Sequence, residues 1–426
     1  MSGRSTSRAW GALTSDSRLL FSARVLRLFA YGFLSVILVL YLAQVGLTAE
    51  QIGLLLTLAL IGDAVISLGI TLSADRIGRR RMLVLGALLM LLAGVAFILT
   101  SQPLLLMAAA LIGVLSPTGN EIGPFLSIEQ AALAQLLQPK RRTQAFAWYS
   151  LAGSFATATG ALSGGLLATY LQSSGLTPLA SYRVVLLGYA GSGLVLVALF
   201  LRLSSSVETA SPARSIQSAL GLHRSRNVVL KLSALFALDA FAGAFVVQSI
   251  VAYWFYTRFG VQEDVLGGIF FGANILAGFS ALLAARIAAR IGLVNTMVFT
   301  HIPSNVLLCL VPFMPTLPLA IGVLLSRFAI SQMDVPTRQS YTLAVVDPDE
   351  RSAASGVTTI ARSVGAALSP SLAGLFLATP ALLGAPFLVA GSLKIVYDLL
   401  LYRNFKTLKP PEEAVDVRPA QVDVAK

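Results

Sequence analysis

The residues of this chain that could do chemistry are charged side chains inside apolar segments. Hydrophobic residues make up 56% of the 426 positions and charged residues only 12%, about half the charged share of a typical soluble chain. A charge at the centre of a bilayer costs roughly 2.5–3.5 kcal/mol on insertion scales, so each must face inward and be paired or hydrated. The candidates for a substrate and proton cavity are Arg27, Asp63, Glu121, Glu129, Asp239, Arg327, Asp334, Arg338 and Arg362.

The segment 317–340 is the richest in such residues. Arg327 is followed at +7, +11 and +14 by Asp334, Arg338 and Tyr341, which places all four on one face of a helix. In the last apolar segment, Lys394 and Asp398 also lie inside a span; because they are one helical turn apart, pairing with each other is the alternative to a role in the cavity.

Three carboxyl groups are candidates for a proton site: Asp63, Asp239 and Glu121. A dry cavity favours the neutral form of a carboxyl group, which lets it load and release a proton near physiological pH. We favour Asp239, because it lies among alanine, phenylalanine and glycine with no basic residue nearby in sequence, whereas Asp63 could be a structural partner for Arg27.

These residues must be positioned by membrane-spanning helices. Twelve apolar segments each approach the roughly 20 residues that a bilayer requires. They cover 23–44, 49–72, 82–100, 103–130, 144–170, 183–203, 229–255, 264–288, 293–313, 317–340, 352–377 and 381–402. We therefore predict an all-α membrane protein of twelve transmembrane helices. Its parts are a six-helix bundle (1–203), a cytoplasmic linker (204–228), a second bundle (229–403) and a disordered tail (404–426).

The two halves repeat. Ala74–Gly78 recurs as Ala288–Gly292 at an offset of 214, and the stretch from Arg142 to Gly165 recurs from Arg351 to Gly374 at an offset of 209. The alternative is chance similarity of short strings rich in small residues. Duplicated bundles with a midplane site between them are the architecture of secondary carriers. The same offset aligns Glu129 with Arg338, which either form a salt bridge that closes the cytoplasmic mouth or pair within their own halves.

The basic residues predict the orientation. Although the net charge is +12, the basic residues collect in alternate loops, and the intervening loops hold only Arg183 and Arg258. This is the bias of cytoplasmic loops, so we expect a multi-pass plasma-membrane protein with both termini in the cytoplasm and no nucleic-acid partner. Cys309 is the only cysteine, which excludes a disulfide and a thiolate metal cluster. We expect no cofactor and no metal.

The turn between the second and third spans carries Asp75, Arg76, Gly78, Arg79 and Arg80. It resembles the loop signature of the major facilitator superfamily, although Thr71 replaces a glycine and Ser73 a leucine of that pattern. The resemblance implies that spans one, four, seven and ten line the cavity. It also implies that Asp75 latches against the start of the eleventh helix, which we expect Asp347 and Pro348 to cap. Topology alone is the other explanation of the arginines.

Small residues end the fifth span at Gly160, Gly164 and Gly165. The run is similar to the antiporter motif of the drug-exporting branches, with Ala161 in place of proline; Pro370 and Gly374 hold the matching places in the eleventh span. Close packing of the two halves is the alternative explanation.

Together these features predict a monomeric secondary carrier that works by alternating access. Proton-coupled efflux of small amphiphilic organic compounds is the primary hypothesis. An organic-anion or phosphate-ester carrier is the alternative, since four arginines could clamp an anion, and a non-transporting membrane sensor is a further one. No nucleophile–base pair, metal-ligand set or Walker motif is recognisable, so we do not expect an enzyme or an ATP-driven pump.

Overall fold

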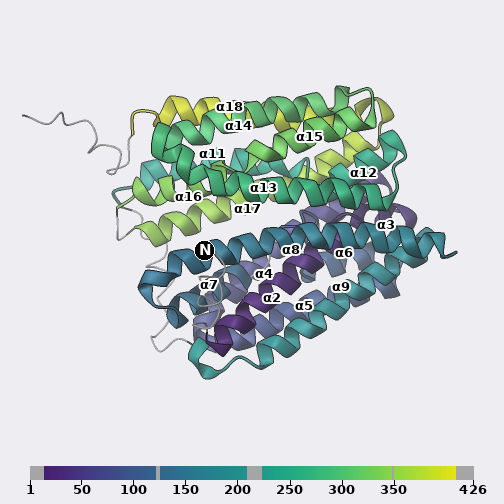
Figure 1. Cartoon of the computed structure of the whole chain (residues 1–426), viewed down its shortest axis with the longest axis horizontal. Helices are drawn as coiled ribbons and strands as arrows, with labels where there is room; N and C mark the ends of the chain where they lie inside the picture. The colour runs from purple at the N-terminus through teal and green to yellow at the C-terminus, as the bar shows by residue number, and fades with distance from the viewer. Residues whose placement is uncertain (1–13, 121–124, 209–222, 348–349, 409–426) are drawn as a thin grey trace, which may run out of the picture.

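The structure is a computed structural model that describes residues 14–120, 125–208, 223–347 and 350–408. Within these ranges all regular secondary structure is helical, and the helices form two bundles, α2–α9 and α11–α18 (Figure 1). Ten helices are long and apolar enough to cross a bilayer, and the bent pair α2–α3 makes an eleventh span. The helices α6 and α7 lie within the remaining predicted span, 103–130. The predicted all-α fold class is therefore confirmed.

The first bundle contains α2 (Ser15–Ser35), α3 (Leu38–Gln44), α4 (Ala49–Ile77), α5 (Arg79–Leu99), α6 (Pro103–Ile112), α7 (Phe125–Leu136), α8 (Pro139–Ser173) and α9 (Pro178–Leu201), followed by the short η1 (Ser205–Val207). The second contains α11 (Arg226–Ala244), α12 (Gln248–Phe259), α13 (Glu263–Ile291), α14 (Leu293–Leu310), η2 (Val311–Phe313), α15 (Leu317–Ser331), α16 (Asp334–Ala344), α17 (Arg351–Leu377), η3 (Pro380–Leu382) and α18 (Ala385–Phe405).

The first, fourth, seventh and tenth spans are each built from two helices. The breaks lie between α2 and α3, where the axis bends by 42°, and between α6 and α7, α11 and α12, and α15 and α16. In the fourth span the chain turns through Gly119, whose φ of +68° is one that glycine adopts without steric cost. Interrupted backbone at membrane depth is tolerated only where it is buried in protein or lines a cavity. The broken spans are the four that the family resemblance assigns to the cavity.

The repeat in the sequence is also a repeat in structure. Helices α4 and α13 are both 29 residues long and both end at a glycine with positive φ, Gly78 at +116° and Gly292 at +86°. We call the end of the molecule that carries these two turns the loop end, and the opposite end the far end.

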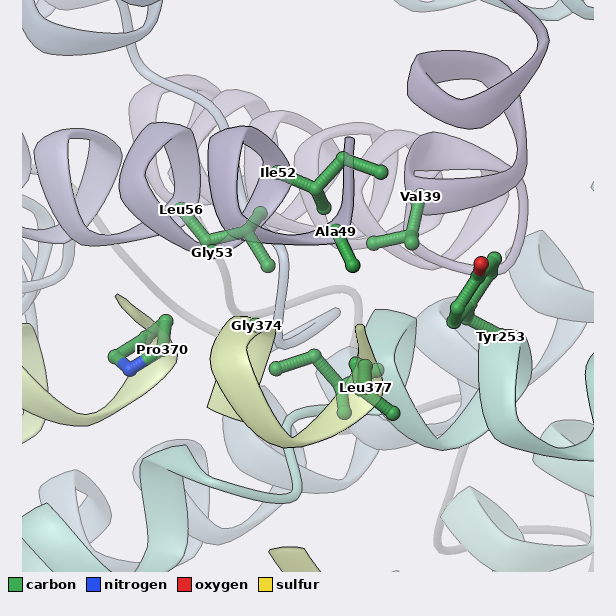
Figure 2. A pocket seen from close by; sticks show the side chains of 10 residues that line it. Val39, Ala49, Ile52, Gly53, Leu56, Tyr253, Pro370, Gly374 and Leu377 are labelled. Atoms are coloured by element: carbon green, nitrogen blue, oxygen red, sulfur yellow. The ribbon is translucent and has the colours of Figure 1, made fainter. Parts of the chain in front are cut away.

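Glycines bring the two bundles into backbone contact near the far end, where α8 packs on α13 and α4 packs on α17. A Cβ atom on Gly165 would lie 2.1 Å from the Glu263 carbonyl oxygen, and one on Gly374 would lie 3.0 Å from the Gly53 Cα atom. Figure 2 shows the apolar pocket that α4 and α17 leave beside this contact. The packing role expected for the small-residue motif therefore applies to Gly165, Pro370 and Gly374.

The other two glycines of the motif lie elsewhere. Cβ atoms on Gly160 and Gly164 would lie 2.1 and 2.3 Å from the carbonyl oxygens of Phe29 and Phe33 on α2. These two positions therefore pack within the first bundle, and the expectation that they join the two halves is wrong.

Candidate functional site

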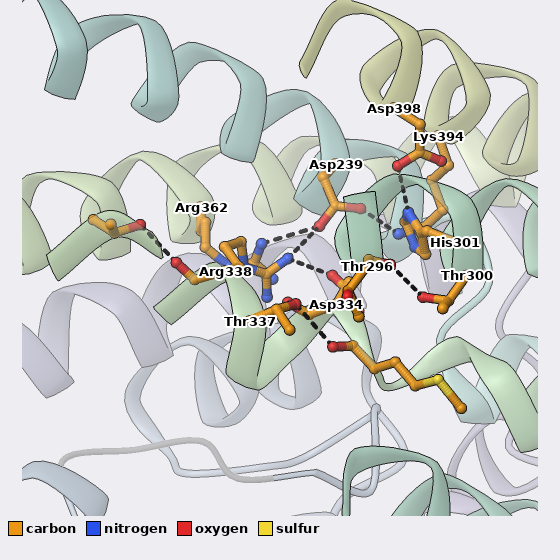
Figure 3. Close-up of polar contacts among 12 residues, drawn as sticks. Asp239, Thr296, Thr300, His301, Asp334, Thr337, Arg338, Arg362, Lys394 and Asp398 are labelled. Carbon is orange, nitrogen blue, oxygen red and sulfur yellow. Dashed lines mark hydrogen bonds and ion pairs between the residues drawn. The ribbon is translucent and has the colours of Figure 1, made fainter. Parts of the chain in front are cut away.

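A cluster of charges in the second bundle is centred on Asp239 of α11. Its Oδ1 atom accepts a hydrogen bond from Lys394 Nζ at 2.5 Å, and its Oδ2 atom accepts from Arg338 at 3.1 Å and from Arg362 at 3.0 Å (Figure 3). The carboxylate thus ties α11 to α16, α17 and α18. Asp239 has no basic residue nearby in sequence, but three cations distant in sequence pair with it, and nearby cations favour the charged form of a carboxyl group.

Arg338 and Arg362 differ in their exposure. Arg338 is buried, donates a second bond to Asp334 at 2.8 Å one helical turn away, and lies 5.5 Å from the Phe236 ring centroid. The Arg362 side chain is 34% exposed. Arg362 is therefore the most exposed member of the cluster.

Arg327 of α15 forms no ion pair with any residue that the structure describes. Its Nε atom is buried and has no hydrogen-bond partner, and its guanidinium carbon lies 4.9 Å from the Phe328 ring centroid. Among the residues that the structure describes, no carboxylate forms a salt bridge with it. Apart from Glu263 and Asp264 in the first turn of α13, the described spans of the second bundle bury or half-bury four cations, Arg327, Arg338, Arg362 and Lys394, and three carboxylates, Asp239, Asp334 and Asp398.

The first bundle has one buried bidentate ion pair. Arg27 Nη1 and Nη2 donate to Glu129 Oε1 and Oε2 at 2.6 and 2.8 Å, and both side chains are completely buried. The Tyr149 hydroxyl also donates to Glu129. The proposed Glu129–Arg338 bridge is therefore not formed. The pairs lie within the halves, as the alternative prediction held, with Arg27–Glu129 joining the first and fourth spans and Asp239–Arg338 joining the seventh and tenth.

Asp63 and Glu121 complete the predicted cavity residues. Asp63 of α4 is half-buried and accepts a bond from Ser67 at 3.2 Å, while Arg27 has Glu129 as its bidentate partner. Glu121 lies outside the described residues.

Neutral polar side chains meet where the first, fourth and seventh spans break. Gln248 at the start of α12 donates to Ser35 Oγ at 2.7 Å and accepts from Asn274 of α13 at 3.2 Å. Ser249 donates to the Ser35 and Pro117 carbonyl oxygens at 2.6 and 2.8 Å. These bonds join the two bundles at the breaks in their spans. The sequence analysis gave Gln248, Ser249 and Asn274 no role. Amide side chains in interrupted spans could have indicated one.

The predicted gating loop is tied to its own half. Arg79 Nε donates to Asp75 at 3.0 Å, and Arg79 Nη1 donates to Gln135 of α7 at 3.0 Å. The Glu208 carboxylate, after η1, accepts from the backbone N–H groups of Arg79 at 2.7 Å and Arg80 at 3.2 Å, a favourable place for an anion at the start of a helix. Gly78 supplies the turn, and Arg76 is exposed.

The expected latch between Asp75 and the eleventh span is not formed in the described part of the chain. Helix α17 begins at Arg351 with Glu350 at its N-cap position, while Pro348 and Asp349 lie outside the described residues. Glu350 itself accepts from the backbone N–H groups of His223, Arg224 and Ser225 at 2.6, 2.9 and 2.9 Å. It therefore caps the segment that leads into α11.

The alternative pairing of Lys394 with Asp398 is not formed either. Lys394 reaches Asp239, and Asp398 accepts instead from His301 Nδ1 at 2.9 Å and from Asn305 at 3.0 Å. Both residues therefore pair with side chains of neighbouring helices and not with each other.

Comparisons with known proteins agree with this architecture. The model of the Major Facilitator Superfamily matches residues 20–370. The chain is 31% identical over 417 residues to the uncharacterized membrane protein YJR124C of Saccharomyces cerevisiae, covering 91% of this chain and 93% of the relative.

Solved structures show the same fold at low identity. The nucleoside transporter NupG superimposes with a TM-score of 0.72 at 15% identity, covering 92% of this chain and all of NupG (100%). A bacterial homologue of the human lysosomal transporter Spinster superimposes with a TM-score of 0.69 at 17% identity, covering 92% of this chain and 96% of that one. This multi-pass membrane protein therefore belongs to the major facilitator superfamily, whose members are transporters and not enzymes.

Proposed function

We propose that this protein is an alternating-access secondary carrier for small amphiphilic organic compounds that bear an anionic group. The observation that carries the proposal is Arg327, a guanidinium within a span whose buried Nε atom has no hydrogen-bond partner and which forms no salt bridge with a described carboxylate. An unpaired charge in this environment is costly and marks a functional site. A carboxylate or phosphate can accept two parallel N–H bonds from a guanidinium, which makes an organic anion the ligand that best completes the site.

The neighbouring residues support an amphiphilic anion. Arg362 offers a second, 34% exposed guanidinium. Gln248 and Asn274 are half-buried amides at the breaks that can hydrogen-bond neutral parts of a ligand, while apolar side chains cover the rest of the spans.

The contacts between the bundles support a state that opens at the loop end. At the far end the halves are joined by the glycine contacts, by Ser371 donating to Thr57 at 2.8 Å, and by the Tyr182 hydroxyl donating to Glu263. On α17 toward the loop end, Ser355 and Thr359 are exposed on the same stripe as Arg362. Because the basic turns lie at this end, we propose that it is cytoplasmic, with both termini there, that the protein is a plasma-membrane protein, and that it works as a monomer.

Export of uncharged compounds in exchange for protons is the second candidate, and the small-residue motif of α8 favours it. That function leaves Arg327 without a ligand. Moreover, only Gly165 of the three motif glycines lies at the interface between the bundles. The drug/proton antiporter branch is therefore the weaker proposal.

Binding of matched acids and neutral analogues tests the proposal. The purified chain is titrated with benzoate, octanoate and phenyl phosphate, and with methyl benzoate and benzamide, while thermal stability and proteoliposome uptake are measured. Loss of a charged hydrogen bond costs about 1.5–3 kcal/mol, so Arg327→Gln should weaken anion binding about 10- to 150-fold, with Arg327→Lys in between. Arg290→Gln, an exposed arginine at the end of α13, is the control. Equal binding of acids and esters, or unchanged affinity in Arg327→Gln, would overturn the proposal.

A further inference from the structure

A buried histidine–carboxylate pair lies outside the cavity residues, between α14 and α18. His301 is 4% exposed, and Asp398 and Asn305 are fully buried. Asp398 Oδ1 lies 2.9 Å from His301 Nδ1, and Oδ2 accepts from Asn305 at 3.0 Å. Since a carboxylate needs a donor, we assign the neutral imidazole's hydrogen to Nδ1, which leaves the lone pair of Nε2 able to accept a proton.

Two ion pairs connect Lys394, the neighbour of this histidine–carboxylate pair on α18, with the partly exposed Arg362. Lys394 precedes Asp398 by one turn on α18 and donates to Asp239 at 2.5 Å. The other oxygen of Asp239 binds Arg362 at 3.0 Å, and the Arg362 side chain is 34% exposed. A change of charge at His301 can therefore act on Arg362 through Asp239 (Figure 3).

The surrounding groups leave His301 as the natural proton acceptor. Asp398 and Tyr397 of α18 contact His301 directly, and Asp239 of α11 and Lys394 of α18 are the nearest other charged groups (Figure 3). The remaining buried or half-buried charged side chains of the neighbouring helices are Arg327 of α15, Asp334 and Arg338 of α16 and Arg362 of α17. Imidazole is the one side chain here whose ordinary titration falls between pH 5 and 8.

We propose that the His301–Asp398 pair is a proton-binding site coupled to the anion site. A hydronium ion gives a proton to His301 Nε2 and becomes water. One O–H bond breaks and one N–H bond forms, and the imidazolium stays paired with Asp398. The added positive charge attracts the Asp239 carboxylate and so weakens its ion pair with Arg362. Arg362 can then bind an anion, and the more positive cluster attracts the anion more strongly. Proton and anion therefore bind cooperatively and move in the same direction. By linkage, a bound anion tightens proton binding by the same factor.

The coupling half of this inference rests on the proposed anion site, but the proton site can be measured alone. The chain has two histidines, and His223 is exposed outside the spans. In a His223→Gln variant of the full chain, nitrogen-15 histidine NMR therefore reports only His301. We expect the ring to titrate between pH 5 and 8, and Asp398→Asn to move the midpoint downward because the imidazolium loses its counterion. A ring that keeps one protonation state across this range would overturn the proton site.

The second arm adds saturating benzoate, octanoate or phenyl phosphate to the same sample. A coupling factor of about 5- to 150-fold would raise the His301 midpoint by about 0.7 to 2 pH units, and would make anion affinity pH-dependent in wild type and His223→Gln but not in His301→Gln. Anions that bind through Arg327 without moving the midpoint would overturn the coupling. A ring that titrates while none of the anions binds would overturn the proposed function and support the proton site alone. A role confined to holding α14 against α18 predicts no titration and no pH-dependent affinity.

Discussion

Adding one methyl group at Gly267 should shift the carrier away from the state with a closed far end. A Cβ atom there would lie 2.9 Å from the Ala161 carbonyl oxygen and 3.2 Å from the Leu162 Cα atom, which are backbone atoms of α8 that cannot rotate aside. Overpacking of this kind costs about 1–3 kcal/mol. Because we propose that this contact exists only while the far end is closed, the cost falls on that state and should change the equilibrium about 5- to 150-fold.

A single-cysteine labelling assay measures the shift. Val39 is 1% exposed and lines the far-end pocket between the halves, so a Val39→Cys probe in a Cys309→Ser background should react with a membrane-impermeant maleimide only when the far end opens. Gly267→Ala should raise the labelling rate about 5- to 150-fold. The matched control is Gly268→Ala, the next residue on α13, whose Cβ position has no atom within 4 Å. Equal labelling rates in the two variants would refute the reasoning, since both gain the same helix propensity.

Three further changes test the remaining contacts. Arg27→Gln leaves the buried Glu129 carboxylate without its cation and should lower the free energy of unfolding by about 3–5 kcal/mol in detergent, whereas replacing both residues by Met and Leu should recover most of it; a double variant no more stable than the single one would contradict this. Glu263→Gln weakens the bond from Tyr182 across the halves and, at about 1 kcal/mol, should speed far-end labelling about 5-fold; no acceleration would mean that this bond does not hold the far end closed. Burial acts to raise the pKa of Glu350, but the backbone N–H donors of His223, Ser225 and Arg224 outweigh it and hold that pKa at about 2. The contact is therefore fully present above the ordinary value of 4.5 and lost only as the pH falls through about 2, so hydrogen-exchange protection of these amides should persist at pH 4 and disappear in Glu350→Ala; loss of protection between pH 5 and 4 would refute the assignment.

The elements that position the site follow from local features of the sequence. Span count depends on runs of about 20 apolar residues, which membranes require whatever their neighbours are. Gly78 and Gly292 mark equivalent turns because both adopt a positive φ that other residues avoid. The resemblance to the family also rests on such local features, and the special place of the first, fourth, seventh and tenth spans was an implication of that resemblance.

The partners of the charged side chains could not be predicted in this way. Sequence spacing put Lys394 beside Asp398 and left Asp239 without a cation, yet in the structure Lys394 binds Asp239 and Asp398 binds His301. The repeat aligned Glu129 with Arg338, and each found its partner in its own half.

The sequence by itself determined which residues enter the membrane, how many helices carry them and that the halves are related. Only the tertiary structure decided which charges neutralise each other and that Arg327 has no ion-pair partner in the described part of the chain. The physical reason is that an α-helix brings together residues three and four positions apart. Contacts between helices depend instead on how each helix is rotated about its axis and on where its backbone approaches the next helix. That rotation is set by packing of the whole bundle, as at Gly53 and Gly374, and no local pattern encodes it.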